Sequence, residues 1–343
     1  MVFELTNGLA RCTKERLRAL SLCISNLLVG YYEGNLILIA SPLLCKFLED
    51  RKLVKGYRER KALNYLKNNF GYRPNVLWHI RVVLDSPDVN KHELDIDFFN
   101  KTESVQYASF LCEHLIDVHF YMRLARTYYP NSPMATIERC GGGGSTVDVL
   151  KSIKKRNVVC LVILDSDCKY PGADRPPKGS TAFRCQQSYK KQRSNIHLQI
   201  LDVHEIENLV PISYMCQNTN AEGLKFLKRL EKHNLLNQLT YYDVKLGIIK
   251  EDASKCPGLM SFAKYLYEAI YPKRQSFDDY LNHKKDEDHL HPALKSTMLS
   301  DFMDDRLKVY QPDIYDAYRK NIADIVHTFM CCRGFEPINE LTV

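Results

Sequence analysis

The chain has 343 residues, of which 45% are hydrophobic and 26% charged, and its formal net charge is +7. This is the composition of a globular protein, which excludes low-complexity disorder, collagen and a small disulfide scaffold. The length allows two or three domains, and the mild positive charge favours an anionic partner only weakly.

The cysteines and the apolar segments predict a soluble, cytoplasmic protein. Most of the 12 cysteines stand singly in apolar runs and no Cys-x-x-Cys pair occurs, so we expect reduced thiols and no zinc ribbon. The most apolar stretch, residues 22–45, is interrupted by Asn26, Glu33 and Asn35. We interpret it as two buried helical segments and not as a membrane span. Neither a basic nor an apolar region opens the chain, so we expect no secretory signal.

The pattern of apolar and polar residues divides the chain into three regions. Residues 1–103 have mostly helical patterns, apart from a strand-like run at 76–84. Residues 104–222 alternate apolar runs with helical patterns, and residues 223–343 return to long amphipathic helical patterns. We therefore expect an α/β core between an N-terminal and a C-terminal helical region.

Four short apolar runs of the middle region are expected to be β-strands: residues 106–112, 134–140, 157–164 and 196–203. The third is nearly continuous in Val, Ile, Leu and Cys, as in a strand that is buried on both faces. Because helical patterns separate the runs, the sequence predicts βαβ units and a Rossmann-like parallel sheet.

Acidic residues follow three of these four strands. Glu113 ends the first strand, and Asp117 lies one helical turn later. The third strand runs into Asp165 and Asp167, and Glu207 follows the fourth. The carboxyl ends of parallel strands meet at one edge of a sheet, so we expect these side chains to converge. Clustered carboxylates repel one another unless a cation lies among them, and oxygen ligands favour Mg²⁺ or Mn²⁺.

A single acidic residue at a strand end is more often a helix cap than a metal ligand. The pair Asp165 and Asp167 is more specific, because residues i and i+2 of an extended chain share a face. Neither capping nor solubility requires two carboxylates on the same side of the chain.

The ordered set of acidic residues resembles the Toprim domain, in particular that of the overcoming-lysogenization-defect (OLD) nucleases and related bacterial anti-phage effectors. The matching stretches are residues 110–117, 162–167 and 204–209, and residues 241–247 resemble a downstream segment in which a lysine serves the site. The similarity covers about residues 105–250, under half of the chain. It implies a Toprim-like core at 104–222, with the lysine segment extending to about residue 250.

The resemblance implies a role for each acidic residue. Glu113, Asp165 and Asp167 would hold one Mg²⁺ or Mn²⁺ ion. Asp117 and Glu207 would help to hold a second ion or orient the first set of ligands.

The lysine and two alternative acids complete the candidate set. Lys245 would contact the scissile phosphate or the charge of the transition state. Glu138 is a weaker alternative for the first-strand glutamate, because only one helix separates it from the Asp pair. Glu205 is an alternative to Glu207, which is preferred because it directly precedes Asn208. His114 stands where the resembling family usually has a glycine after the first glutamate.

The function that this resemblance implies is a metal-dependent nuclease that cleaves DNA, or RNA, as the effector of an anti-phage defence system. The resembling enzymes couple the domain to an ATPase, so we expect a separate ATPase or sensor protein as partner. We expect no membrane association, and the resemblance is compatible with an oligomer. Two alternatives stay open: a primase- or topoisomerase-like nucleotidyl transferase, and a non-catalytic nucleic-acid-binding module.

A glycine run and several basic clusters complete the sequence analysis. The run at 141–144 lacks the lysine of a nucleotide-binding P-loop and is expected to be a tight strand-to-helix turn facing a nucleic-acid phosphate. Basic clusters are more often solvated faces, although two of them flank the acidic segments in sequence. The clusters are Lys151, Lys154, Lys155 and Arg156; Lys190, Lys191 and Arg193; and Lys225, Lys228, Arg229 and Lys232.

Overall fold

The computed structural model describes residues 1–189, 194–272, 274–305 and 312–332. The chain forms two compact units. Unit 1 comprises residues 1–162, 188–199 and 320–343, and unit 2 comprises residues 163–187 and 200–319. This division differs from the boundaries expected at residues 103 and 222, because the chain leaves unit 1 within the third core strand, returns to it for residues 188–199 and again with most of the last helix.

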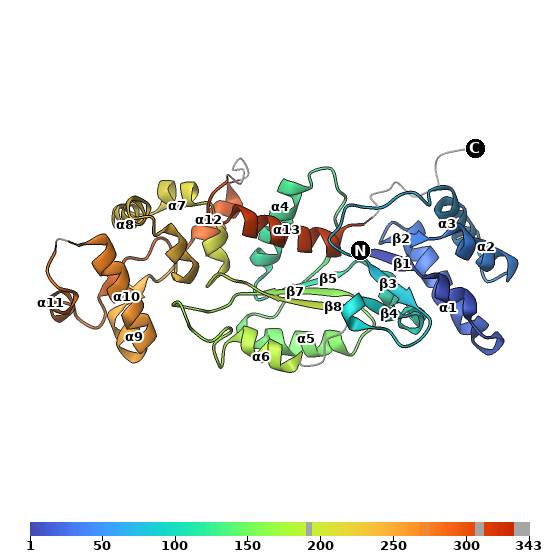
Figure 1. The fold of residues 1–343 in the computed structure, drawn as a ribbon, viewed down its shortest axis with the longest axis horizontal. Coiled ribbons are helices and arrows are strands. Elements are labelled where there is room, and N and C mark those ends of the chain that lie inside the picture. Colours follow the sequence, from blue (N-terminus) through green and yellow to red (C-terminus); the bar gives the residue numbers. More distant parts are fainter. Residues whose placement is uncertain (190–193, 273, 306–311, 333–343) are drawn as a thin grey trace. The chain divides into compact units, whose positions relative to one another are not determined.

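Unit 1 contains a four-stranded parallel sheet within the first 103 residues (Figure 1). Its strands are β1 (Val2–Leu5), β2 (Ile37–Ala40), β3 (Ile80–Val83) and β4 (Glu93–Asp95), in the order β2-β1-β3-β4. The helices α1 (Leu17–Tyr32), α2 (Pro42–Asp50) and α3 (Tyr57–Asn68) accompany it. The expected helices are present, but only β3 of the four strands was expected.

The interpretation of residues 22–45 as two helical segments was wrong in its second half. Helix α1 ends at Tyr32, and the chain turns through Gly34, whose φ of +82° suits glycine. The following β2 is buried along its whole length. A short apolar run that is buried on all sides shows no periodicity that separates a strand from a helix.

The second sheet of the chain contains all four expected core strands. They are β5 (Ser109–Cys112), β6 (Ile137–Cys140), β7 (Cys160–Leu164) and β8 (Ile196–Ile200), in the order β6-β5-β7-β8. Strand β5 is parallel to both β6 and β7. Helices α4 (Leu115–Tyr128) and α13 (Asp316–Met330) lie on one side of this sheet and α5 (Thr146–Lys154) on the other (Figure 1). The α/β class with parallel sheets flanked by helices is therefore confirmed.

Helices predominate in unit 2. They are α6 (Thr181–Ser188), α7 (Ile212–Asn218), α8 (Ala221–Lys232), α9 (Lys250–Lys255), α10 (Pro257–Ile270), α11 (Phe277–Asn282) and α12 (Met298–Asp304). A short antiparallel pair, β9 (Ile248–Ile249) and β10 (His289–His291), lies among them. The twelve cysteines of the chain form no disulfide. Within the described residues, no helix combines the length and apolar character that crossing a bilayer requires.

A buried ion pair stabilises unit 2. Arg319 is fully buried, and its guanidinium binds both carboxylate oxygens of Asp313 at 2.7 and 3.1 Å. It also donates to the carbonyl oxygen of Leu209 at 3.2 Å. Because a desolvated charge needs its partner, removing only the arginine leaves a mostly buried carboxylate uncompensated.

We expect Arg319→Leu to lower the free energy of unfolding by about 3–5 kcal/mol, the usual cost of breaking a buried pair. Urea denaturation followed by circular dichroism measures the loss. Lys255→Ala is the matched control, since it breaks an exposed ion pair with Glu251 and should cost less than about 1 kcal/mol. Equal losses in the two variants would contradict the importance of the buried pair.

The glycine run forms the tight turn that the sequence predicted between β6 and α5. Gly142 and Gly143 have φ angles of +64° and +46°, and the Gly142 N–H donates to the Glu113 carbonyl oxygen at 2.9 Å. A Cβ atom on Gly141 would lie 2.3 Å from the backbone nitrogen of Thr146. Only glycine at position 141 allows the chain to approach the start of α5 this closely.

Gly141→Ala should therefore lower the free energy of unfolding by about 1–3 kcal/mol, because backbone atoms must move to accept the methyl group. Thermal denaturation measures the change. Gly71→Ala is the control, since an added Cβ meets nothing within 4 Å there and φ is not positive. If Gly141→Ala were as stable as Gly71→Ala, the close approach of Gly141 to Thr146 would not contribute to the free energy of unfolding.

Candidate functional site

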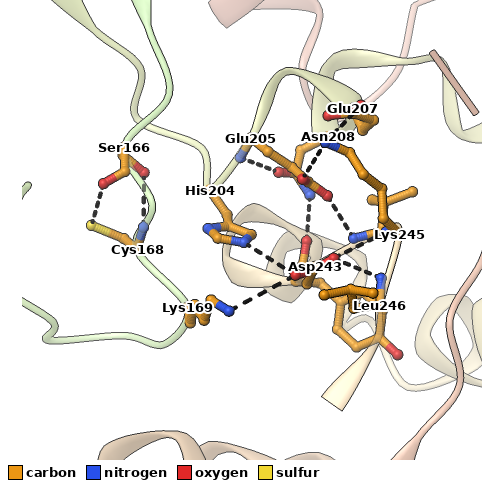
Figure 2. Close-up of polar contacts among 12 residues, drawn as sticks. Ser166, Cys168, Lys169, His204, Glu205, Glu207, Asn208, Asp243, Lys245 and Leu246 are labelled. Carbon is orange, nitrogen blue, oxygen red and sulfur yellow. Dashed lines mark hydrogen bonds and ion pairs between the residues drawn. The ribbon is translucent and has the colours of Figure 1, made fainter. Parts of the chain in front are cut away.

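Three segments of unit 2 come together around a group of charged side chains (Figure 2). The first is the loop after β7, residues 165–169. The second follows β8 and contains the 3-10 helix η7 (Ile206–Leu209). The third is the turn at residues 243–246, before β9. We call the charged side chains of these segments the acidic cluster: Asp165, Asp167, Lys169, His204, Glu205, Glu207, Asp243 and Lys245.

Backbone hydrogen bonds hold the first two segments together. The buried Ser166 hydroxyl donates to the Val203 carbonyl oxygen at 2.6 Å and accepts from the Cys168 N–H at 3.3 Å. The Asp167 N–H donates to the His204 carbonyl oxygen at 3.0 Å. A serine between the two aspartates therefore serves the connection between the strand ends.

The aspartate pair does not have the extended geometry that the sequence predicted. Asp167 has a φ of +58°, in the left-handed region that non-glycine residues rarely adopt. The argument that Asp165 and Asp167 share a face because the chain is extended was therefore wrong, since the hydrogen bond to His204 turns the chain at Asp167. Burial raises the pKa of Asp167, while His204, Lys169 and Lys245 oppose that rise.

Lys245 lies between two buried glutamates. Its ammonium nitrogen is 3.1 Å from Oε2 of Glu205 and 3.0 Å from Oε1 of Glu207, and the glutamates are 7% and 5% exposed. Burial lowers the pKa of Lys245, but the two carboxylates raise it by more, so the ammonium form is favoured. Lys245 therefore supplies the positive charge that two neighbouring carboxylates need in order to stay ionised.

The two glutamates differ in their other partners. Oε1 of Glu205 accepts the Val244 N–H at 2.8 Å, whereas Oε2 of Glu207 is buried with no hydrogen-bond partner. Burial and the neighbouring Glu207 charge raise the pKa of Glu205 to about 7, although Lys245 opposes the rise. Glu205 is therefore a fixed side chain that takes up a proton easily, and Glu207 has an oxygen available to a further partner.

Asn208 is the scaffold of this segment. Its side-chain oxygen accepts the Glu205 N–H at 2.8 Å. Its amide nitrogen donates to the carbonyl oxygens of Leu239 and Tyr242 at 2.7 and 2.8 Å. The fully buried Asn208 thereby joins the glutamates to the chain that leads to Lys245.

Asp243 orders the turn that carries Lys245. Its Oδ1 accepts the N–H groups of Lys245 and Leu246 at 3.1 and 2.7 Å. Its Oδ2 lies 3.8 Å from Nε2 of His204 and 4.0 Å from Nζ of Lys169. Burial raises the pKa of Asp243, but His204 and the Leu246 N–H lower it by more, so the carboxylate form is favoured.

Sequence reasoning missed Asp243 and its contact with His204. His204 is 4% exposed, contacts Asp243 and has a buried Nδ1 without a hydrogen-bond partner. Asp243 lies two residues before Lys245 in the stretch that carries the resemblance, so its position in that stretch was the available signal.

The first-strand candidates belong to unit 1. Glu113 directly follows β5, as expected, and has part of its surface buried. Asp117 is buried in the first turn of α4, where its Oδ2 accepts the His114 N–H at 2.9 Å. This contact makes Asp117 a helix-capping residue, the structural role that an acid at this position commonly has.

Glu138 lies inside β6, opposite Phe110, and not at the strand end. Its exposed carboxylate is 3.1 Å from Nε2 of His119. Glu138 therefore lacks the strand-end position that made it an alternative to Glu113.

The described members of the basic clusters are mostly engaged in local contacts. Lys151 pairs with Asp148 at 3.1 Å and Arg156 with Glu103 at 3.1 Å, and the Arg229 guanidinium lies 4.4 Å from the Tyr271 ring centroid. These contacts agree with solvated faces. The cluster Lys190, Lys191 and Arg193 lies outside the described residues.

The acidic cluster contains the oxygen donors that divalent cations prefer, but the carboxylates are not drawn together around one point. Among the residues that the structure describes, no three His, Cys, Asp or Glu side chains form a group that could hold a metal ion. The carboxylates nevertheless outnumber the lysines, and Oε2 of Glu207 has no partner. Comparisons with protein families, curated proteins and solved structures found no match for this chain.

The raised pKa of Glu205 predicts that the free energy of unfolding depends on pH. The measurement is made in EDTA, so that metal ions do not contribute. Between the usual pKa of about 4.5 and the raised value of about 7, the folded chain binds more protons at Glu205 than the unfolded chain does. The free energy of unfolding should therefore fall as pH rises through this window. Glu205→Gln should flatten the curve, because glutamine cannot ionise.

Urea denaturation at several pH values measures both curves. The matched control is Glu287→Gln, which alters an exposed glutamate of the same unit and should follow the wild type. Parallel curves for wild type and Glu205→Gln would show that Glu205 ionises at its ordinary pKa in the folded chain.

Proposed function

We propose that the chain is a divalent-metal-dependent nuclease that hydrolyses phosphodiester bonds of DNA or RNA. The observation that supports it most is the charge imbalance of the acidic cluster (Figure 2). Five carboxylates, those of Asp165, Asp167, Glu205, Glu207 and Asp243, lie on segments that contribute only two lysines. Figure 2 shows Glu205, Glu207 and Asp243 with Lys169 and Lys245. A partly buried excess of negative charge is stabilised by binding cations.

The carboxylates that we propose as ligands of Mg²⁺ or Mn²⁺ in this unit are Asp165, Asp167 and Glu207, which would have to draw closer together around the ion than they do in the structure. Backbone N–H groups already bind Glu205 and Asp243, whereas Glu207 retains a buried oxygen without a partner. A divalent ion supplies an activated water and stabilises charge on the phosphoryl oxygens. The roles of Glu113 and Asp117 rest on the sequence resemblance alone, and Asp117 also caps α4.

The other residues of the cluster position these groups. Asn208 and the Val244 N–H fix Glu205, and Asp243 fixes the turn that carries Lys245. Lys245 holds the two glutamates side by side, and its side chain is 40% exposed, so that a phosphate at the surface of the cluster can approach it.

One observation favours a second candidate function, a nucleic-acid-binding module without catalysis. Lys245 already neutralises part of the charge of Glu205 and Glu207 in a stable arrangement that needs no metal. In such a module the acidic residues would serve folding only, and no metal would change the stability of the chain.

We expect the purified chain to cut supercoiled plasmid DNA or bulk tRNA with Mn²⁺ or Mg²⁺ and not with EDTA. The double variant Asp165→Ala/Asp167→Ala should lose at least about 100-fold in rate, because it lacks groups that hold the ion and the attacking water. Gel electrophoresis of timed reactions measures the rates. Asp278→Ala removes an exposed aspartate of the same unit and should cut like the wild type.

A thermal shift with Mn²⁺ separates the two candidate functions when the isolated chain does not cut. A shift that the double variant lacks favours a nuclease that awaits its partner. An equal shift, or none, in both proteins favours the binding module. The proposed partner is a separate ATPase or sensor protein of an anti-phage system, and cutting that appears only when such an ATPase is added to the chain would support it.

A further inference from the structure

Unit 1 contains a cavity whose lining residues lie outside the three segments of the acidic cluster. Its volume is about 270 Å³, and it lies between strand β2, helix α3 and the segments around Ser132 and Cys331. All of its lining residues belong to unit 1. An engineered apolar cavity of about 150 Å³ accepts benzene, so this volume accommodates two fused rings.

The walls are aromatic and aliphatic. Strand β2 contributes four buried aliphatic residues, Ile37–Ala40, and the aromatic rings of Tyr31, Tyr65 and Phe70 form much of the remaining surface. Among the described residues that line the cavity there is no Asp, Glu, Lys, Arg or His. A charged ligand would lose its hydration without gaining a partner, so the cavity selects a neutral molecule.

The opening is marked by exposed aromatic residues. Phe70 and Tyr72 line the cavity and are 42% and 61% exposed, although both are large apolar side chains. Flat rings at the mouth and in the walls favour a flat ligand, because aromatic pairs gain from stacked or edge contacts beyond their buried area.

One wall has a polar group with a fixed position. The Ser132 hydroxyl oxygen is 2.8 Å from Nε2 of His327, and the His327 ring stacks on Tyr129 with a centroid distance of 3.8 Å. Burial lowers the pKa of His327 to about 4, so the imidazole is neutral. The hydroxyl also lies 3.9 Å from Sγ of Cys331, and a hydroxyl with one donor and two acceptor sites can still bond a ligand in the cavity.

The Ser132–His327 pair is not suited to nucleophilic catalysis. Nδ1 of His327 is buried with no hydrogen-bond partner, so no carboxylate orients the ring. A histidine with such a low pKa is also a weak base at neutral pH. The pair therefore serves recognition.

We propose that this cavity binds a neutral, planar heteroaromatic molecule of about two fused rings, with one ring hydrogen-bonding group directed at Ser132. The binding is independent of the proposed nuclease activity. The walls supply stacking and apolar burial, and Ser132 supplies the orientation of the ring.

The test is isothermal titration calorimetry of the full chain with indole and with indene, which have the same shape but differ in one N–H group. We expect saturable indole binding with a submillimolar dissociation constant. Ser132→Ala should weaken indole binding about fivefold and leave indene binding unchanged, because only indole donates to the hydroxyl.

Two variants fill the cavity from opposite walls, so that one remains informative when the other fails to fold. Ser132→Phe and Asn69→Phe should each weaken indole binding by at least about tenfold, because the new ring takes the space of the ligand. The controls Asn131→Phe and Asn68→Phe add the same ring at neighbouring exposed positions that do not line the cavity. Circular dichroism confirms that each variant is folded.

The outcome that overturns the proposal is the absence of saturable binding for both indole and indene. Indole binding that a folded cavity-filling variant retains at wild-type strength overturns it as well, because the ligand must then bind elsewhere. Equal effects of Ser132→Ala on indole and indene would refute the hydrogen bond to Ser132.

Discussion

The arrangement of unit 2 depends on the ion pairs that Lys245 makes with Glu205 and Glu207. Two carboxylates that are almost fully buried repel each other and lose their hydration, and the shared ammonium offsets part of both costs. The turn that carries Lys245 is in turn ordered by Asp243, and the glutamate segment is tied to the same stretch of chain by Asn208. The cluster is a connected network, in which the Val244 N–H fixes Glu205 and Asn208 ties the glutamate segment to the chain before Lys245.

The residues of this network fall into two groups with different roles. Asn208, Ser166 and Asp243 make hydrogen bonds that hold segments together. Glu207 and Lys245 have atoms that remain available to a ligand, since one carboxylate oxygen lacks a partner and the ammonium is partly exposed. The proposed chemistry belongs to the second group and requires the first to keep the carboxylates close together.

The two sites differ in the ligands that their physics admits. The acidic cluster concentrates charge at the ends of segments, where only a cation or a phosphate with its cation is stabilised. The cavity of unit 1 is lined, within the part of the chain that the structure describes, by uncharged residues, and a neutral histidine fixes the position of the Ser132 hydroxyl. Since a charged group gains nothing in the cavity and an apolar ring gains little at the cluster, the two sites select different chemical classes.

The sequence by itself determined the α/β class, the four core strands and the turn at the glycine run. Those features depend on local periodicity and on the conformational freedom of glycine, which a single chain displays without its neighbours. It also located Glu205, Glu207 and Lys245 as candidates, although the order of residues could not say that the lysine lies between the glutamates. Strands β1, β2 and β4 of the sheet in the first 103 residues were not predicted, because strands of three or four residues are too short to show a period that separates them from helix.

Only the tertiary structure decided the left-handed turn at Asp167, the cap made by Asp117 and the contact between His204 and Asp243. Each depends on a hydrogen bond or charge contact whose partner is set by how the chain turns back on itself. The cavity is of the same kind, because its walls come from β2, α3 and residues near both 132 and 331. A pattern in sequence shows which residues suit a site, and packing between distant segments decides which of them meet.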